Sequence, residues 1–325
     1  MAWAKANTVT IPQMELIMRY IPMKRRPASL ALAIGGWSFN PTNVMETYDI
    51  LTNTWSISSI KLPMNSAYHG VVELDGKIFI AGGFDGENYL DRLLCLDMST
   101  MMWEEMSPML TKRCYIATVT LNGKIFAIGG HDGTNRLKTV EMYDPSMNMW
   151  MEMPSMKQIR SDFGVTVYEG KIFAIGGFDG HHVLSSVEYF CPVKGKWMDS
   201  SPLSVPRSGV TAMVVEKRIF VLGGYNGVER LSSVECFEPG ITRALWYQVQ
   251  DMLHRRSNFA AFVMEGMLRV VGGYKKDMIL VDGEVCGDVE IYCMKENVWR
   301  ELSSLQVSRS ALSCVVVADQ QHSIM

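Results

Sequence analysis

The stretch RIFVLGG, residues 218–224, decides the fold, because its apolar run and terminal glycine pair recur along the chain. Successive first glycines are 47, 47, 47, 47 and 49 residues apart. The pairs are Gly35-Gly36, Gly82-Gly83, Gly129-Gly130, Gly176-Gly177, Gly223-Gly224 and Gly272-Gly273. A tryptophan follows each of them, at Trp55, Trp103, Trp150, Trp197, Trp246 and Trp299. The chain is therefore built from six copies of one structural unit.

Each unit contains four short β-strands, here called a, b, c and d. In the fifth copy, residues 209–215 form an apolar, β-branched run, and 218–224 follow after two residues as its hairpin partner. Residues 231–237 alternate, and 245–249 surround a tryptophan. Four antiparallel strands in about 47 residues predict an all-β, six-bladed propeller. The glycine pair lets the chain leave strand b sharply, and the tryptophan fills the wedge between blades.

The two ends of the chain predict how the ring closes. The first copy starts at strand b, residues 29–36, with no strand a before it. The last copy is followed by residues 309–317, which have the pattern of strand a with no strand b after them. We expect the C-terminal strand to pair with the N-terminal blade, since this removes two open sheet edges.

Composition excludes several function classes. A net charge of -3 and a pI near 6.1 give no basic footprint, so we expect no nucleic-acid partner. No apolar run reaches the ~18 residues that cross a bilayer, so we expect no membrane partner. The seven cysteines are scattered and odd in number, which indicates reduced thiols and a cytoplasmic protein.

Signals for catalysis are weak. The Gly-Gly-x-Asp-Gly strings precede no helical pattern, so they are not phosphate-binding loops. The six histidines show no ligand spacing apart from the adjacent pair His181-His182, on a loop where solvation is the common state. We expect no enzymatic activity, no metal and no cofactor.

The repeat resembles the kelch motif. That motif has a glycine pair, a turn such as Phe84-Asp85-Gly86, then Glu-x-aromatic, and a tryptophan about seven residues on. The Glu-x-aromatic element stands at 46–48, 141–143, 188–190, 235–237 and 290–292. The second blade departs with Leu94-Cys95-Leu96, so we expect it to lack whatever that glutamate bonds.

The strings that open strand a resemble those of the BTB-BACK-kelch family of cullin-3 ubiquitin ligase adaptors. They are Ala67-Tyr68-His69-Gly70, Arg113-Cys114-Tyr115, Arg160-Ser161-Asp162, Arg256-Ser257-Asn258-Phe259 and residues 309–314. In that family the BTB domain recruits cullin-3 and the propeller holds the substrate. Residues 14–26 resemble the last BACK helix, and no BTB-like segment precedes them. The expected domains are 1–26 with this helix remnant, 27–318 as the propeller, and a tail at 319–325. We expect the chain to bind cullin-3 only through BTB and BACK regions that it lacks.

The predicted partner site lies on the loops from d to a and from b to c, which share one face. Arginines next to aromatic rings are typical of protein-binding hot spots. Arginines also favour an acidic or phosphorylated protein segment, as the family resemblance implies. The predicted site residues are Arg113, Arg160, Arg207, Arg256, Arg309, Trp37, Tyr68, Phe84, Tyr115, Phe178, Tyr225, Phe259 and Tyr274.

Several alternatives remain open at this point. The repeated arginines could equally tie blades together by bonding loop carbonyls, and the serines after them fit turn capping better than ligand binding. Actin-binding proteins use the same repeats, and some kelch propellers are metallo-oxidases. The b-to-c loop of the last blade, around residues 275–288, is six residues longer than that of the fifth blade. This longer loop could be a partner contact or a neutral insertion.

Overall fold

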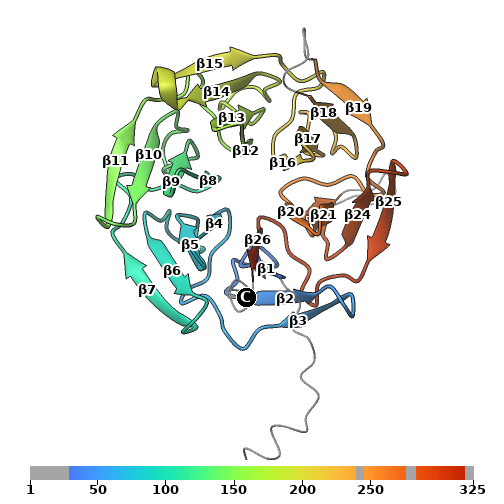
Figure 1. Ribbon diagram of the computed structural model, residues 1–325, viewed down its shortest axis with the longest axis horizontal. Helices are drawn as coiled ribbons and strands as arrows, with labels where there is room; N and C mark the ends of the chain where they lie inside the picture. The colour runs from blue at the N-terminus through green and yellow to red at the C-terminus, as the bar shows by residue number, and fades with distance from the viewer. Residues whose placement is uncertain (1–28, 239–244, 276–282, 319–325) are drawn as a thin grey trace, which may run out of the picture.

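The computed structural model describes residues 29–238, 245–275 and 283–318. Within them, six antiparallel four-stranded sheets surround a central axis (Figure 1). The predicted six-bladed, all-β propeller is confirmed. The one helical element of these residues is a single 3-10 turn, Pro192–Lys194. Residues 1–26 and 319–325, predicted as a BACK-like remnant and a tail, lie outside the described residues.

Every blade runs from strand a at the axis to strand d at the outside. The first three blades are β26 (Ser313–Ala318), β1 (Ser29–Ile34), β2 (Met45–Asp49), β3 (Thr54–Ile57); β4 (Gly70–Leu74), β5 (Lys77–Ala81), β6 (Leu93–Asp97), β7 (Met102–Met106); β8 (Ala117–Leu121), β9 (Lys124–Ile128), β10 (Val140–Asp144), β11 (Met149–Met153). The last three are β12 (Gly164–Tyr168), β13 (Lys171–Ile175), β14 (Val187–Cys191), β15 (Lys196–Ser200); β16 (Thr211–Val215), β17 (Arg218–Leu222), β18 (Val234–Phe237), β19 (Tyr247–Val249); β20 (Ala260–Met264), β21 (Met267–Val271), β24 (Val289–Cys293), β25 (Val298–Leu302).

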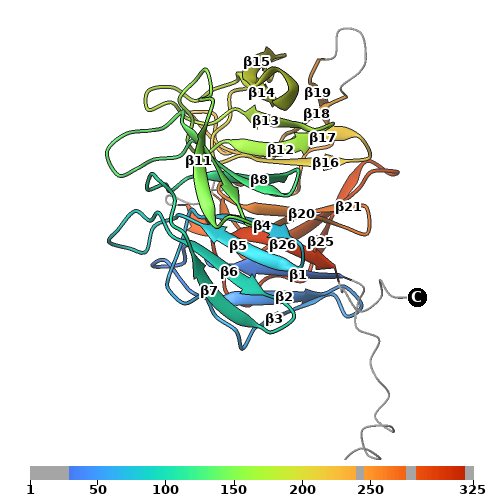
Figure 2. The same cartoon turned by 60° about the vertical axis from the view of Figure 1, so that its left-hand side comes forward.

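Antiparallel pairing fixes which loops share a face. The a-to-b and c-to-d turns gather at one end of the strands, and the b-to-c and d-to-a loops gather at the other, which we call the loop face (Figure 2). In the sixth blade, β22 (Tyr274–Lys275) and β23 (Glu284–Val285) pair at the base of the long loop. Much of that predicted insertion, 276–282, lies outside the described residues.

The predicted ring closure is confirmed. β26 pairs with β1 over six residues, from Ser29 opposite Ala318 to Ile34 opposite Ser313. The strand is shorter than the sequence predicts, because residues 309–312 form the loop that enters the blade. In the fifth blade, strand c starts later than predicted, at Val234, since Leu231 and Ser232 bond loop residues. Strand d starts at Tyr247, two residues later than predicted.

Backbones of neighbouring blades approach closely at the glycine pairs. The first glycine has a positive φ in all six pairs. A Cβ on Gly129 would lie 2.4 Å from the carbonyl oxygen of Arg160 in the next blade, and one on Gly82 2.2 Å from that of Arg113. The next amide uses this approach: Gly130 N–H donates to the Arg160 carbonyl at 2.9 Å. Glycine is therefore required both for conformation and for space.

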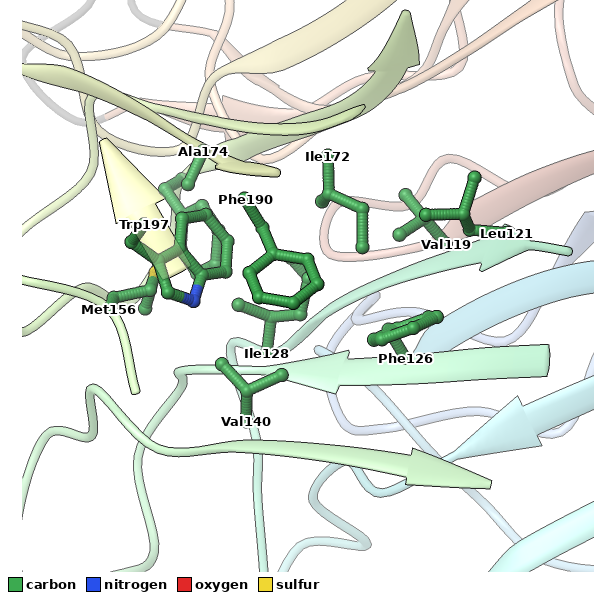
Figure 3. Close-up of a cluster of buried hydrophobic side chains, with 12 residues drawn as sticks. Val119, Leu121, Phe126, Ile128, Val140, Met156, Ile172, Ala174, Phe190 and Trp197 are labelled. Atoms are coloured by element: carbon green, nitrogen blue, oxygen red, sulfur yellow. The ribbon is translucent and has the colours of Figure 1, made fainter. Parts of the chain in front are cut away.

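The hydrophobic core consists of six clusters, one at each boundary between blades. Between the third and fourth blades, Phe126 and Ile128 face Phe190 and Trp197 (Figure 3). The Trp197 indole N–H donates to the Pro154 carbonyl at 2.8 Å, on the chain that enters the blade. At this boundary the tryptophan fills the wedge between two blades, as the sequence predicts.

The remaining sequence features fit this interior. All seven cysteines are free, and five of them are buried, as expected for small apolar side chains. The described part of the chain contains no helix with the length and apolarity needed to span a lipid bilayer.

We predict that a chain ending before Arg309 folds poorly. It loses every β1–β26 pair and the buried Leu312, Val315 and Val317. Losing several buried side chains costs at least about 5 kcal/mol, or roughly 10 °C in Tm for a protein of this size. Thermal melts should compare it with a chain ending after Ala318, which keeps the pairing. Equal melting temperatures would show that β26 does not hold the ring.

Candidate functional site

The centre of the loop face is a ring of six residues with left-handed backbones. They are Tyr68, Tyr115, Asp162, Gly209, Asn258 and Ala311, with φ between 51° and 57°. Five backbone hydrogen bonds link them in sequence around the axis, from Tyr68 N–H to the Ala311 carbonyl at 3.0 Å through to Asp162 N–H and the Tyr115 carbonyl at 3.2 Å. Between Tyr68 and Tyr115 the two phenol rings pack 4.1 Å apart instead. We call this ring the mouth.

The mouth opens into space along the axis. A cavity of about 130 Å³ lies between the mouth residues and the residues that lead into strand a. A second cavity, of about 190 Å³, continues between the six inner strands. Five of the side chains just below the mouth are apolar: Ile116, Phe163, Val210, Phe259 and Leu312. The sixth is His69. Across residues 29–238, 245–275 and 283–318, no group of His, Cys, Asp and Glu could hold a metal ion.

A belt of half-buried rings and guanidinium groups surrounds the mouth. In the third, fourth and sixth blades, the first residue after the glycine pair meets a residue from the b-to-c loop of the blade before it. Tyr89 packs on His131 at 5.4 Å, and the Arg136 guanidinium lies 4.5 Å from the centre of the Phe178 ring. Arg230 lies likewise 4.2 Å from the Tyr274 ring. This belt consists of Trp37, Phe84, Tyr89, His131, Arg136, Phe178, Val183, Tyr225, Arg230 and Tyr274.

Among the described b-to-c loops, two tips carry exposed apolar side chains. Phe39 is 94% exposed in the b-to-c loop of the first blade, beside Trp37. Val228 is 88% exposed at the tip of the equivalent loop in the fifth blade. At the corresponding tips of the second, third and fourth blades the residues are polar or glycine, so these two side chains are particular to their blades.

The five predicted arginines are not on the surface, which corrects the predicted site. Arg113, Arg160, Arg207, Arg256 and Arg309 are all at most 1% exposed. The Arg207 guanidinium donates to the Gly223 carbonyl at 2.9 Å and to Glu235 at 3.0 Å, and the other four repeat this arrangement. The alternative reading, in which the arginines bond loop carbonyls, describes them correctly.

Each arginine joins two blades. Its backbone carbonyl accepts from the glycine pair of the blade before, and its guanidinium binds the blade that it enters. The glutamate partner also accepts the backbone N–H of the incoming loop, as Glu188 does from Lys157 at 2.7 Å. Burial lowers the pKa of Arg160, and the Glu188 carboxylate opposes that shift. We call this arrangement the arginine junction.

The second blade has no arginine junction. It carries Ser66 where the other blades have arginine and Leu94 where they have glutamate, so both charges are replaced together. The prediction that this blade lacks the glutamate's bonds is therefore confirmed. The expectation of an acidic partner rested on the arginines as a positive centre, and their burial and ion pairing remove that support.

The predicted aromatic residues divide into two groups. Phe259 is buried at 5% exposure between the fifth and sixth blades. The others are half-buried on the loop face: Trp37, Tyr68, Phe84, Tyr115, Phe178, Tyr225 and Tyr274. Asp162, Arg136 and Arg230 also lie on the loop face and were not among the predicted site residues. The period contains a signal for the last two, because Tyr89, Arg136, Val183 and Arg230 stand 47 residues apart.

His69 occupies a position that is apolar in the other five blades. It is 4% exposed, and its ring lies near the carbonyls of Ile34 and Ser66 without a hydrogen bond of good geometry to either ring nitrogen. Burial lowers the pKa of His69 to about 4, and the positive charge of Arg309 adds to this shift. The imidazole is therefore neutral at pH 7.

The fold is that of a β-propeller built from sequence repeats, and comparison with known proteins identifies the same kind of repeat. The family model "KLHDC2/KLHL20/DRC7 Kelch-repeats domain" matches residues 28–204, more than half of the chain. The "Kelch motif" model matches residues 206–253 and 255–306. The chain belongs to the kelch-repeat family, whose propellers are generally protein-interaction modules.

Curated relatives match parts of the chain. Spermatocyte protein spe-26 of Caenorhabditis elegans is 32% identical over 94 residues, 29% of this chain and 16% of that protein. Kelch repeat-containing protein kel-10 and Kelch repeat and BTB domain-containing protein F47D12.7, both from C. elegans, are each 31% identical over 120 residues, 36% of this chain and 21% of theirs. The matched part thus spans about a fifth of these relatives or less.

A solved structure supports the fold. The protein described as "Structure of YjhT" superposes with a TM-score of 0.70 at 12% identity, over 77% of this chain and 87% of that one. At this identity the likeness shows the propeller fold alone.

We predict that breaking an arginine junction destabilises the propeller. Arg160→Ser alone and Glu188→Leu alone each leave one buried charge without its partner, at a cost of about 3–5 kcal/mol. The double variant copies the Ser66 and Leu94 pair of the second blade, so it should cost less than the sum of the two. Denaturant unfolding of all four proteins measures the coupling. Strict additivity would contradict a coupled pair.

We predict that His69→Leu stabilises the protein more in acid than in base. The imidazole of His69 has a pKa near 6.5 in the unfolded chain and about 4 in the folded protein, so between these values the unfolded chain binds more protons. The free energy of unfolding therefore falls as the pH falls from about 6.5 to about 4. At pH 5 this loss is about 2 kcal/mol, and it vanishes at pH 8. Leucine stands at the same position of the first blade as Leu312. Unfolding of both proteins at pH 5 and pH 8 gives the difference; no pH dependence in it would refute the assignment.

Proposed function

We propose that the loop face binds a segment of a partner protein, and that the chain is the substrate-recognition part of a cullin-3 RING E3 ubiquitin ligase adaptor. The observation that carries the first part is the belt together with the tips: rings, guanidinium groups and the exposed apolar side chains of two b-to-c loop tips gather on one face around the mouth. Aromatic residues and arginine are enriched at interface hot spots.

The belt is rigid before any partner binds. Three rings of the belt are held by a neighbour from the adjacent blade, namely His131 by Tyr89, Phe178 by Arg136 and Tyr274 by Arg230. The Arg136 Nε also donates to Ser161 at 2.9 Å. A surface that is already ordered loses little side-chain entropy on binding, so its contacts contribute fully to affinity. Phe39 and Val228 remain free to enter pockets of the partner, because nothing covers them.

Family membership supports the adaptor role. One relative's name, Kelch repeat and BTB domain-containing protein F47D12.7, joins this repeat to a BTB domain in one polypeptide. The proposed adaptor would use the propeller for the substrate and a BTB region for cullin-3. We infer a cytoplasmic location from the free cysteines and from this role.

We predict that Phe39→Asp and Val228→Asp weaken partner binding while the fold stays intact. Removing an apolar hot spot costs about 2 kcal/mol, or roughly thirtyfold in affinity. The matched control is Val193→Asp: Val193 is 97% exposed, but it lies on a c-to-d turn at the opposite end of the strands. A partner trapped by cross-linking in cells and then purified supplies the affinity measurement. Equal losses for Val193→Asp and Val228→Asp would refute the loop face as the site.

The adaptor role has its own test. The partner should accumulate when the chain is depleted from cells, and its cullin-3-dependent ubiquitination should fall with Phe39→Asp. A partner that binds the loop face but keeps its level and its ubiquitination unchanged would refute the adaptor role and leave the binding face standing.

A further inference from the structure

We propose that the mouth binds the head group of one basic side chain, a lysine ammonium or an arginine guanidinium, presented by the partner protein. The inference rests on the proposed function and names the chemistry that the centre of the loop face recognises. It reverses the charge expected from the sequence, where the arginines pointed to an acidic segment.

The carboxylate of Asp162 is the first observation. Asp162 stands in the mouth with φ 56°, and Tyr68, Tyr115 and Asn258 border the same cavity. Its carboxylate accepts one hydrogen bond, from the Ser161 hydroxyl at 2.8 Å. Among the described residues it forms no ion pair. A carboxylate that is removed from water in this way is costly unless a cation pairs with it.

In the described part of the chain, the one cation that influences the Asp162 carboxylate, Arg136, already has other partners. Arg136 acts on Asp162 through space, but its guanidinium stacks on Phe178 and its Nε donates to Ser161. Ser161 thus lies between the two charges. The carboxylate oxygens that Ser161 does not occupy remain available to a ligand donor.

The tyrosines provide the second part of the site. The Tyr68 and Tyr115 rings lie 4.1 Å apart beside Asp162, and Trp37 lies 6.4 Å from Tyr68. Burial raises the pKa of both phenols, and the charge of Asp162 adds to it, so they stay protonated at neutral pH. Aromatic faces next to a carboxylate attract cations through the ring quadrupole as well as through charge.

Space and protonation state are suitable. The cavity below the mouth has about 130 Å³, enough for a head group together with water. Gly209 also borders this cavity, and a Cβ there would lie 2.5 Å from Asn258 Oδ1. Burial raises the pKa of Asp162 to about 6, so the carboxylate is mostly ionised at pH 7. An anionic ligand would meet that charge unfavourably.

A peptide titration tests the site. The probes are acetylated pentapeptides, Gly-Gly-X-Gly-Gly amides, in which X is lysine, arginine, glutamate or Nε-acetyl-lysine, titrated at pH 7 into the full chain and followed by NMR. Lysine and arginine peptides should bind, and glutamate and acetyl-lysine peptides should bind at least tenfold more weakly. Absence of binding by both basic peptides, or equal binding by all four, would overturn the proposal.

Two variants locate the binding. Asp162→Asn keeps the shape but removes the charge, and should weaken the basic peptides at least tenfold. Asp132→Asn makes the same charge change in a turn of the loop face, where the carboxylate already bonds the N–H groups of Thr134 and Asn135, and should change binding less than twofold. Equal losses for the two variants would mean diffuse attraction to an acidic surface and would refute the site. Thermal melts verify that both variants are folded.

The outcome also separates this proposal from the proposed function. If Phe39→Asp and Val228→Asp lose the partner but Asp162→Asn retains it fully, the loop face stands and the basic head group is wrong. If the basic peptides need Asp162 while Phe39→Asp and Val228→Asp leave partner binding unchanged, the mouth is a real cation site and the proposed partner face is wrong.

Discussion

The arginine junction is the interaction on which the rest of the structure depends. Apolar packing between blades is non-directional and would tolerate small rotations. The junction removes that freedom, because the Arg207 carbonyl is fixed by the glycine pair of one blade and its guanidinium by Glu235 and Gly223 of the next. Burying two charges is favourable only with such geometry and such additional bonds. The loop that carries the arginine continues directly into the mouth, so the junction also sets the position of the mouth residues.

The fold could be predicted from the sequence because the features that build it must be repeated. A glycine where two backbones approach and a tryptophan between blades are required at every boundary, and the period displays them. The same logic explains why the arginines misled the prediction of the site. A residue present in five blades serves a need that every blade shares, whereas a partner segment has no sixfold symmetry. The residues that distinguish one position of the loop face from another, Asp162, Phe39 and Val228, break the repeat and give no periodic signal.

The mouth also shows what sequence patterns cannot convey. Five residues other than glycine take left-handed backbones there, at a cost of about 1 kcal/mol or more each. They persist because each backbone is held in the hydrogen-bonded circle by its neighbours. Tyr68 and Tyr115 meet as rings only through this arrangement, since 47 residues separate them in the chain. No local propensity of Asp162 predicts that it shares the lining of one cavity with these two tyrosines.

The second blade has Ser66 and Leu94 in place of the arginine junction, and His69 in place of the apolar residue below the mouth, so the ring is not equally constrained around its circumference. Buried side-chain polar atoms of Ser66 and His69 have no hydrogen-bond partner among the described residues. In each of the other five blades, an arginine–glutamate ion pair fixes the loop that leads into strand a. Regions with fewer such constraints open at lower free energy than the global unfolding of a protein. We therefore expect local opening of the ring to begin at the seam between the first and second blades. Because Tyr68 leads into the second blade, its N–H bond to the Ala311 carbonyl and its ring contact with Trp37 are the links of the mouth that cross this seam.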